Sequence, residues 1–89
     1  MSEAEFVVAS ELGLHARPAG EFAALASKFA SEISIARAGS DDWVSGRSVL
    51  SLLSLAASQG TKLQLRAEGD DAAAAIKALG ALLTRPHAG

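Results

Sequence analysis

The chain has 89 residues, of which 49% are apolar and 20% are charged. This composition is typical of a single folded domain, here spanning residues 1–89, and excludes the disordered and fibrous classes of protein. The net charge of −2 leaves no broad basic surface for nucleic acid, and the absence of cysteine excludes disulfides, thiolate metal sites and thiol redox chemistry.

The N-terminus gives no sign of export. Residues 1–5 are polar and acidic, unlike the basic start and apolar segment of a secretory signal. No stretch of the sequence is long and apolar enough to span a bilayer. We therefore expect a cytoplasmic protein that binds neither membrane nor nucleic acid, and the lack of cysteine agrees with a reducing compartment.

In chain order, a short strand and then a helix are predicted. Residues 5–10 contain a phenylalanine and two consecutive valines and favour a strand. After a loop at residues 11–14, apolar residues recur at three- and four-residue steps from Ala16 onward, which is the period of an amphipathic helix. The apolar face of this helix comprises Ala19, Phe22, Leu25, Ala26 and Phe29.

The middle of the chain predicts a β-hairpin. Residues 32–37 alternate in polarity, so that Ile33 and Ile35 share one face. A turn at residues 39–42 joins this strand to a second one at residues 43–44.

The second half of the chain predicts a helix, a strand and a helix. A short apolar helix begins after Ser48, and residues 61–67 then alternate so that Leu63 and Leu65 face inward. Two aspartates at residues 70–71 begin the last helix, where carboxylates suit the N-cap and the helix dipole. The buried stripe of this helix comprises Ala75, Ile76, Leu79, Leu82 and Leu83.

The predicted order of elements is therefore β-α-β-β-α-β-α. Short amphipathic helices need an apolar surface to cover, and an antiparallel sheet with helices packed on one face provides it. We predict an α+β fold in which a four-stranded antiparallel sheet carries three helices on one face.

The segment Gly13-Leu14-His15-Ala16-Arg17-Pro18-Ala19 carries the strongest chemical signal. His15 falls in the N-cap region of the first helix, where free backbone N–H groups and the positive end of the helix dipole favour an anion. Pro18 suits the first turn because it has no N–H, which leaves Ala16 and Arg17 as the nearest free donors. The guanidinium of Arg17 also matches the geometry of phosphate oxygens.

An imidazole beside an anion site is suited to phosphoryl transfer. A neutral imidazole near pH 7 has a free lone pair, and phosphoryl transfer requires mainly position and charge stabilisation from the protein. A phosphorus–nitrogen bond is labile, so the group can be passed on. Taken singly, His15 also fits a solvated cap, Arg17 a surface charge and Pro18 a helix starter, so the hypothesis depends on their combination.

Residues 13–19 resemble the active-site signature of HPr, the phosphocarrier family of the phosphoenolpyruvate-dependent sugar phosphotransferase system. Residues 45–55, which begin Ser-Gly-Arg-Ser-Val-Leu, resemble the helix that carries the regulatory serine of that family. Chain length and element order also agree with HPr. The resemblance implies an open-faced β-sandwich with strand order 1-4-2-3, and a carrier protein of sugar transport rather than an enzyme.

The resemblance also implies roles for individual residues. His15 would accept a phosphoryl group on Nδ1 from phospho-enzyme I and donate it to an enzyme IIA. Ala16, Arg17 and Pro18 would bind the phosphate, with Arg17 assisting the transfer. No cofactor and no metal ion is implied for the chain itself, and we expect a monomer.

A second group of candidate residues surrounds Ser48. Ser48 precedes an apolar run and suits the N-cap of a helix. By resemblance it also matches the serine that an HPr kinase phosphorylates in some bacteria. Val49, Leu50 and Leu53 match the apolar docking patch of the family, with Arg47 at its rim; the alternative is that some of them pack on the sheet.

A second hypothesis is an HPr-derived regulatory binding protein that is controlled by phosphorylation of Ser48 and acts on a transcription factor or an enzyme. The presence of His15 together with Arg17 favours the carrier. An autonomous enzyme is disfavoured, since the sequence has no acid–base pair and no cofactor motif.

Two residues differ from the family pattern, and a second histidine lies outside the active-site motif. Leu12 occupies a position where HPr proteins often carry a small polar residue, and Ala56 replaces a frequent glycine. The second histidine, His87, lies in the tail without a supporting cluster, so we predict no role and no metal site there.

Overall fold

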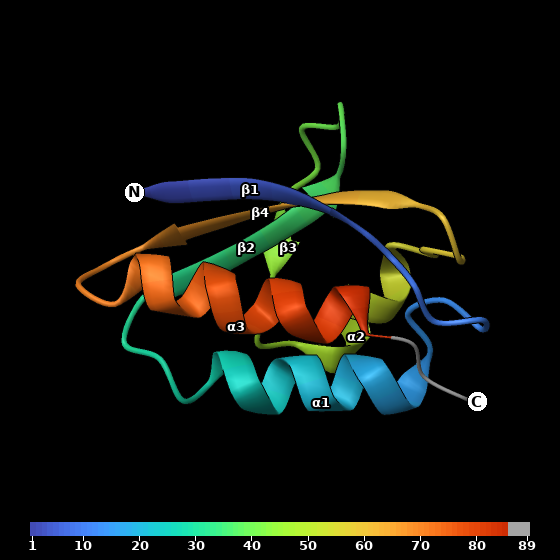
Figure 1. The fold of residues 1–89 in the computed structure, drawn as a ribbon, viewed down its shortest axis with the longest axis horizontal. Helices are drawn as coiled ribbons and strands as arrows, with labels where there is room; N and C mark the ends of the chain where they lie inside the picture. The colour runs from blue at the N-terminus through green and yellow to red at the C-terminus, as the bar shows by residue number, and fades with distance from the viewer. Residues whose placement is uncertain (86–89) are drawn as a thin grey trace.

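A four-stranded antiparallel sheet forms the centre of the structure, a computed structural model that describes residues 1–85 (Figure 1). The strands are β1 (Ser2–Val7), β2 (Glu32–Arg37), β3 (Val44–Ser45) and β4 (Lys62–Glu68), and the helices are α1 (Ala16–Ala26), α2 (Val49–Ser54) and α3 (Ala72–Thr84). Figure 1 shows α1 and α3 side by side below the sheet, and α2 contacts α1. The predicted α+β class and element order are confirmed, as is the strand order β1-β4-β2-β3 that the resemblance implied.

The first strand lies earlier in the chain than residues 5–10, where the sequence placed it. β1 pairs with β4 from Ser2 to Val7. Two residues on, the N–H of Ala9 donates to the carbonyl of Leu83 near the end of α3 (3.1 Å), so the chain has left the sheet. The sequence did not indicate a strand at residues 2–4 because alternate residues of β1 face solvent and are polar.

The core fills the space between the sheet and the helices. The inward side chains of β2 and β4 are at most 2% exposed, as their alternation predicted; they are Ile33, Ile35, Leu63 and Leu65. The predicted stripe of α3 is buried as well. α3 approaches β1 closely at Gly80, where a Cβ would lie 2.2 Å from the ring of Phe6. This packing fixes the helices relative to the sheet.

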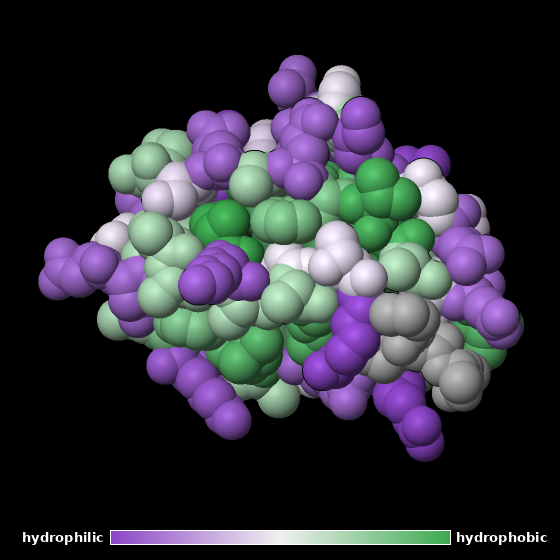
Figure 2. Space-filling view, in the orientation of Figure 1, coloured by the Kyte–Doolittle hydropathy of each residue, from purple (hydrophilic) through white to green (hydrophobic). Residues whose placement is uncertain are grey.

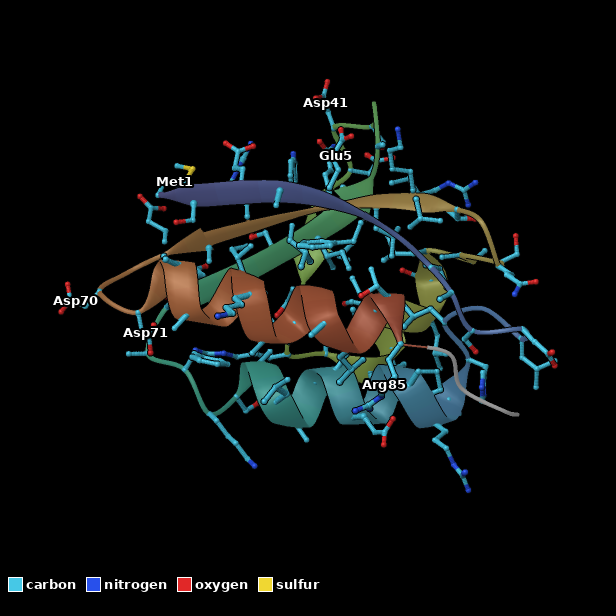
Figure 3. All side chains as sticks on the ribbon, in the orientation of Figure 1. Met1, Glu5, Asp41, Asp70, Asp71 and Arg85 are labelled. Atoms are coloured by element: carbon cyan, nitrogen blue, oxygen red, sulfur yellow. The ribbon has the colours of Figure 1, made fainter. Side chains whose placement is uncertain are left out.

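The outer surface differs between the two layers. Figure 2 shows apolar residues gathered over the helices, where the exposed positions of α3 are largely alanine, with hydrophilic residues around them. On the sheet, the guanidinium of Arg66 stacks 4.0 Å from the ring centre of Trp43. The connection at residues 38–43 stands above the sheet, with Asp41 labelled there in Figure 3, and Gln64 donates to the carbonyl of Ser40 (2.9 Å). The sheet face is therefore polar and carries its own side-chain contacts.

Asp71 ties the start of α3 to the loop after α1. Its carboxylate accepts hydrogen bonds from the N–H groups of Ala30 (2.8 Å) and Ser31 (2.9 Å) and from the Ser31 hydroxyl. The predicted capping bond to its own helix is not made. Figure 3 shows Asp71 at the end of α3 opposite to Arg85. The Ser31 hydroxyl, followed by the backbone donors, holds the pKa of Asp71 below its ordinary value.

We expect acid to weaken the fold through Asp71. Because its pKa is lowered in the folded state, the carboxylate stabilises the fold above the ordinary Asp pKa, and this stabilisation is lost as the pH falls through the folded pKa. Asp71→Asn should therefore be less stable than wild type at neutral pH and lose less stability in acid. Thermal unfolding across this pH range measures both effects.

The matched control is Asp70→Asn, because Asp70 is an exposed carboxylate one residue earlier that makes no hydrogen bond within residues 1–85. It should keep the pH dependence of the wild type. If Asp71→Asn unfolded with the same pH dependence as wild type, the bonds to Ala30 and Ser31 would not be the source of the acid sensitivity.

Candidate functional site

His15 is the N-cap residue of α1, as the sequence predicted. Its backbone is extended (φ −86°, ψ −171°), and its carbonyl oxygen accepts the N–H of Ala19 (2.9 Å), which begins the helix. The imidazole makes no capping hydrogen bond. The side chain is therefore placed at the helix N-terminus but remains available for other chemistry.

The two ring nitrogens of His15 have different surroundings. Nε2 is buried and has no hydrogen-bond partner within residues 1–85, and it is the only one of the two ring nitrogens in that state. In a neutral imidazole one nitrogen carries the proton and the other a lone pair. The burial of Nε2 leaves Nδ1 as the ring nitrogen that is the better candidate for reaction with a reagent from solvent.

Unpaired donors lie next to the imidazole. The N–H groups of Ala16 and Arg17 have no acceptor in the described part of the chain, and Pro18 is buried in the first turn without an N–H to satisfy. The side chain of Arg17 is exposed and makes no ion pair within residues 1–85. The first turn of α1 contains no acidic residue. Together these groups form an uncompensated positive site beside a nucleophile.

A close backbone contact supports the loop before His15. The N–H of Leu14 donates to the carbonyl of Ala57 (2.8 Å), and the Leu14 side chain is buried. Gly13 has a φ of +72°, and a Cβ at this position would lie 2.2 Å from the same carbonyl oxygen. Both the conformation and the lack of space therefore require glycine. The segment after α2 is the surface on which the His15 loop rests.

Ala56, which begins this segment, is the one non-glycine residue with a positive φ (+50°) in the described chain. The left-handed conformation costs a residue with a Cβ about 1 kcal/mol, which explains why glycine suits the position. The guanidinium of Arg37, at the end of β2, donates from Nη1 to the carbonyls of Leu55 (3.0 Å) and Ala56 (3.4 Å). Sequence reasoning missed Arg37, because a single arginine at a strand end gives no sign of a contact 18 residues away.

α2 exposes an apolar surface. Leu50 is 81% exposed and Val49 and Leu53 are each 37% exposed, whereas Leu52 between them is fully buried. The three apolar residues of the predicted docking site, Val49, Leu50 and Leu53, are hereafter the α2 patch, and they do not pack in the core. Leu12, in the loop before His15, is 62% exposed. α2 contacts α1, and the segment after α2 accepts the N–H of Leu14 in the loop that carries His15.

Ser48 and Arg47 have different surroundings. Ser48 is the N-cap of α2, as predicted, and its hydroxyl oxygen accepts the backbone N–H three residues on (3.2 Å). Arg47 donates from Nη2 to the carbonyls of Phe29 (2.8 Å) and Ser31 (2.9 Å). These carbonyls follow the C-terminal end of α1, whereas His15 precedes its N-terminal end. The structure therefore separates Arg47 from the His15 site and gives it contacts within the fold.

The described residues contain neither a candidate metal site nor a candidate membrane span. No group of three or more histidine, aspartate or glutamate side chains in residues 1–85 is placed to hold a metal ion. None of the helices in that range has the length and apolar character needed to cross a membrane. His87, for which no role was predicted, lies outside the described residues.

Comparisons with known proteins agree on one family. A family model described as the PTS HPr component phosphorylation site matches residues 2–85. The chain is 42% identical over 86 residues to the phosphocarrier protein HPr of Haloferax volcanii, and the match covers 97% of each protein.

Solved structures give the same result. The structure is similar to HPr of Thermoanaerobacter tengcongensis, with a TM-score of 0.85, 42% identity and coverage of 93% of this chain and 91% of that one. It is also similar to the catabolite repression protein Crh of Bacillus subtilis, with a TM-score of 0.72, 37% identity and coverage of 82% of each chain.

Proposed function

Because the chain belongs to the HPr family of phosphocarriers of the phosphotransferase system, we propose that it carries a phosphoryl group on His15 from phospho-enzyme I to an enzyme IIA in sugar uptake. The observation that carries the proposal is the placement of His15 at the N-terminus of α1, with Nε2 as its buried ring nitrogen and with the unpaired N–H groups of Ala16 and Arg17 next in the chain. The protein acts as a single, monomeric domain in the cytoplasm.

In the accepting step, the lone pair of His15 Nδ1 attacks phosphorus. The bond between phosphorus and the donor breaks, and its electron pair returns to the donor. Nε2 keeps the ring proton. Charge on the transferring oxygens is stabilised by the N–H groups of Ala16 and Arg17 and by the Arg17 guanidinium. In the donating step the enzyme IIA nucleophile attacks the same phosphorus and Nδ1 leaves, so the chain is a carrier and not an enzyme.

The direct test is to incubate the chain with phosphoenolpyruvate and enzyme I. The proposal predicts a mass increase of one phosphoryl group that is lost in acid, as a phosphorus–nitrogen bond requires. Adding an enzyme IIA should then remove the group from the chain. No mass increase, or an acid-stable one, would overturn the proposal.

The α2 patch is proposed as the surface that docks both partners. Its three side chains are exposed although they are apolar, and the segment that follows α2 is bonded to the loop that carries His15. Apolar residues that remain exposed on a small protein commonly mark a surface for a partner. Arg47 is proposed to lie at the distal rim of this surface, since its bonds to the chain after α1 hold it there.

Leu50→Asp tests this surface. Leu50 is 81% exposed, so the change should leave the melting temperature nearly unaltered. A buried charge at an interface costs affinity, and we expect KM for phosphorylation by enzyme I to rise at least about tenfold. The control is Ala74→Asp, which adds the same charge at an exposed position of α3. Equal rates for Leu50→Asp and wild type would remove α2 from the interface.

A second candidate function is regulatory, and the likeness to the catabolite repression protein Crh supports it. Ser48 would be phosphorylated by an HPr kinase and would then control binding to a transcriptional regulator. The Ser48 hydroxyl caps α2 next to the α2 patch, so a phosphate there would be tolerated by the helix and would alter docking. Incubation with an HPr kinase and ATP tests it: acid-stable phosphate on Ser48 supports this function, and none would remove it.

A further inference from the structure

We propose that Arg37 is a positioning residue for His15, because its guanidinium holds the left-handed turn at Ala56 on which the His15 loop rests. The inference rests on the proposed phosphoryl transfer at His15, but its first test, hydrogen exchange of the Leu14 amide, requires no phosphate. Three contacts link the guanidinium to the imidazole.

The first contact fixes the end of α2. Arg37 is the last residue of β2 and is held in register opposite Leu63 of β4, so its side chain starts from a rigid strand. Its Nη1 donates to the carbonyls of Leu55 (3.0 Å) and Ala56 (3.4 Å). Carbonyls at the end of a helix lack partners within it, and a cation there also matches the helix dipole. The bond therefore joins the sheet to the end of α2.

The second link is the left-handed turn at Ala56. Ala56 adopts a φ of +50°, which an alanine leaves readily when nothing holds it there. The bonds from Arg37 end at this residue and at the one before it. The turn sets the direction of the next carbonyl, that of Ala57. Losing the guanidinium should let the turn relax and should move this carbonyl.

The third contact reaches Leu14, the residue before His15. The carbonyl of Ala57 accepts the N–H of Leu14 (2.8 Å), the residue directly before His15. Gly13 is packed so closely against the same segment that a Cβ would lie 2.2 Å from the Ala57 oxygen. With no free space, a shift of the segment after α2 displaces the loop. Phosphoryl transfer tolerates such displacement poorly, since a misplacement of about 1 Å can cost a hundredfold in rate.

The test begins with Arg37→Gln. We expect hydrogen exchange of the Leu14 amide to accelerate at least about tenfold. We expect kcat for phosphorylation by enzyme I to fall about tenfold, with KM nearly unchanged because Arg37 lies outside the α2 patch. Arg37→Lys, which keeps one charged donor, should restore part of the protection of the Leu14 amide and part of kcat. Unchanged Leu14 exchange in Arg37→Gln would overturn the inference.

Ala56→Gly and Asp71→Asn separate positioning from general stability. Glycine adopts the left-handed turn without cost, so Arg37→Gln should slow phosphorylation less in an Ala56→Gly background. Additive effects of the two substitutions on the phosphorylation rate would overturn the inference.

Asp71→Asn is the control for general stability, because it destabilises the fold at the loop after α1. If it slowed phosphorylation as much as Arg37→Gln at equal stability, Arg37 would have only a structural role. Should the wild type accept no phosphate, the proposed function fails, while Leu14 exchange still decides on the link from Arg37.

Discussion

His15→Ala is expected to abolish phosphate acceptance while leaving the fold intact. The reaction needs a nitrogen lone pair at the N-terminus of α1, and His15 is the only histidine among residues 1–85. The imidazole makes no capping bond, and its Nε2 is buried without a partner in residues 1–85. Its removal should therefore change the free energy of unfolding by no more than about 1 kcal/mol.

Mass spectrometry after treatment with phosphoenolpyruvate and enzyme I measures the loss of acceptance, and thermal unfolding measures the fold. The matched control is His87→Ala, which removes the only other histidine of the sequence and should accept phosphate as wild type does. Labelling of His15→Ala at the wild-type rate would show that the phosphoryl group goes elsewhere.

Arg17→Ala is expected to slow phosphorylation by enzyme I about a hundredfold, equivalent to about 3 kcal/mol of transition-state stabilisation. The guanidinium is exposed and makes no ion pair in the described chain, so its charge is available to the transferring oxygens. The same exposure means that the melting temperature should hold. Arg17→Lys keeps the charge but loses the fork of donors, and its rate should fall between the two.

Rapid-quench measurement of the phosphorylated fraction gives these rates. Lys28→Ala is the control, because Lys28 is an exposed cation just beyond the other end of α1. Its removal changes the net charge equally and should leave the rate within a factor of about two. If Lys28→Ala and Arg17→Ala slowed transfer alike, long-range attraction between the proteins would explain the effect.

Most of the fold could be predicted because burial imposes a period on the sequence. β4 alternates between a buried and a solvated face, and the five predicted residues of α3 all lie in the core. β1 was misplaced because the residues that face solvent hide the strand. The fate of Asp71 was also missed: a carboxylate at a helix start predicts a cap, whereas its partners lie 40 residues away.

The candidate site divides in the same way. His15, Arg17 and Pro18 are neighbours in sequence, and the chemistry of a helix N-terminus follows from their order alone. The support of the loop could not be predicted, because Gly13 meets Ala57, and Arg37 meets Leu55, only in the folded chain. Arg47 shows the converse. Its position in a recognised segment predicts a docking role, which stays a prediction, and the fold adds bonds from its guanidinium to the chain after α1 that the sequence did not indicate.

The nitrogen of His15 that carries the phosphoryl group tests the account most directly. NMR of the phosphorylated protein, with nitrogen-15 in the imidazole and phosphorus-31 detected, identifies the bonded atom. The account predicts a phosphorus–nitrogen bond at Nδ1, with the proton on the buried Nε2. A bond at Nε2, or phosphate on any other residue, would contradict it.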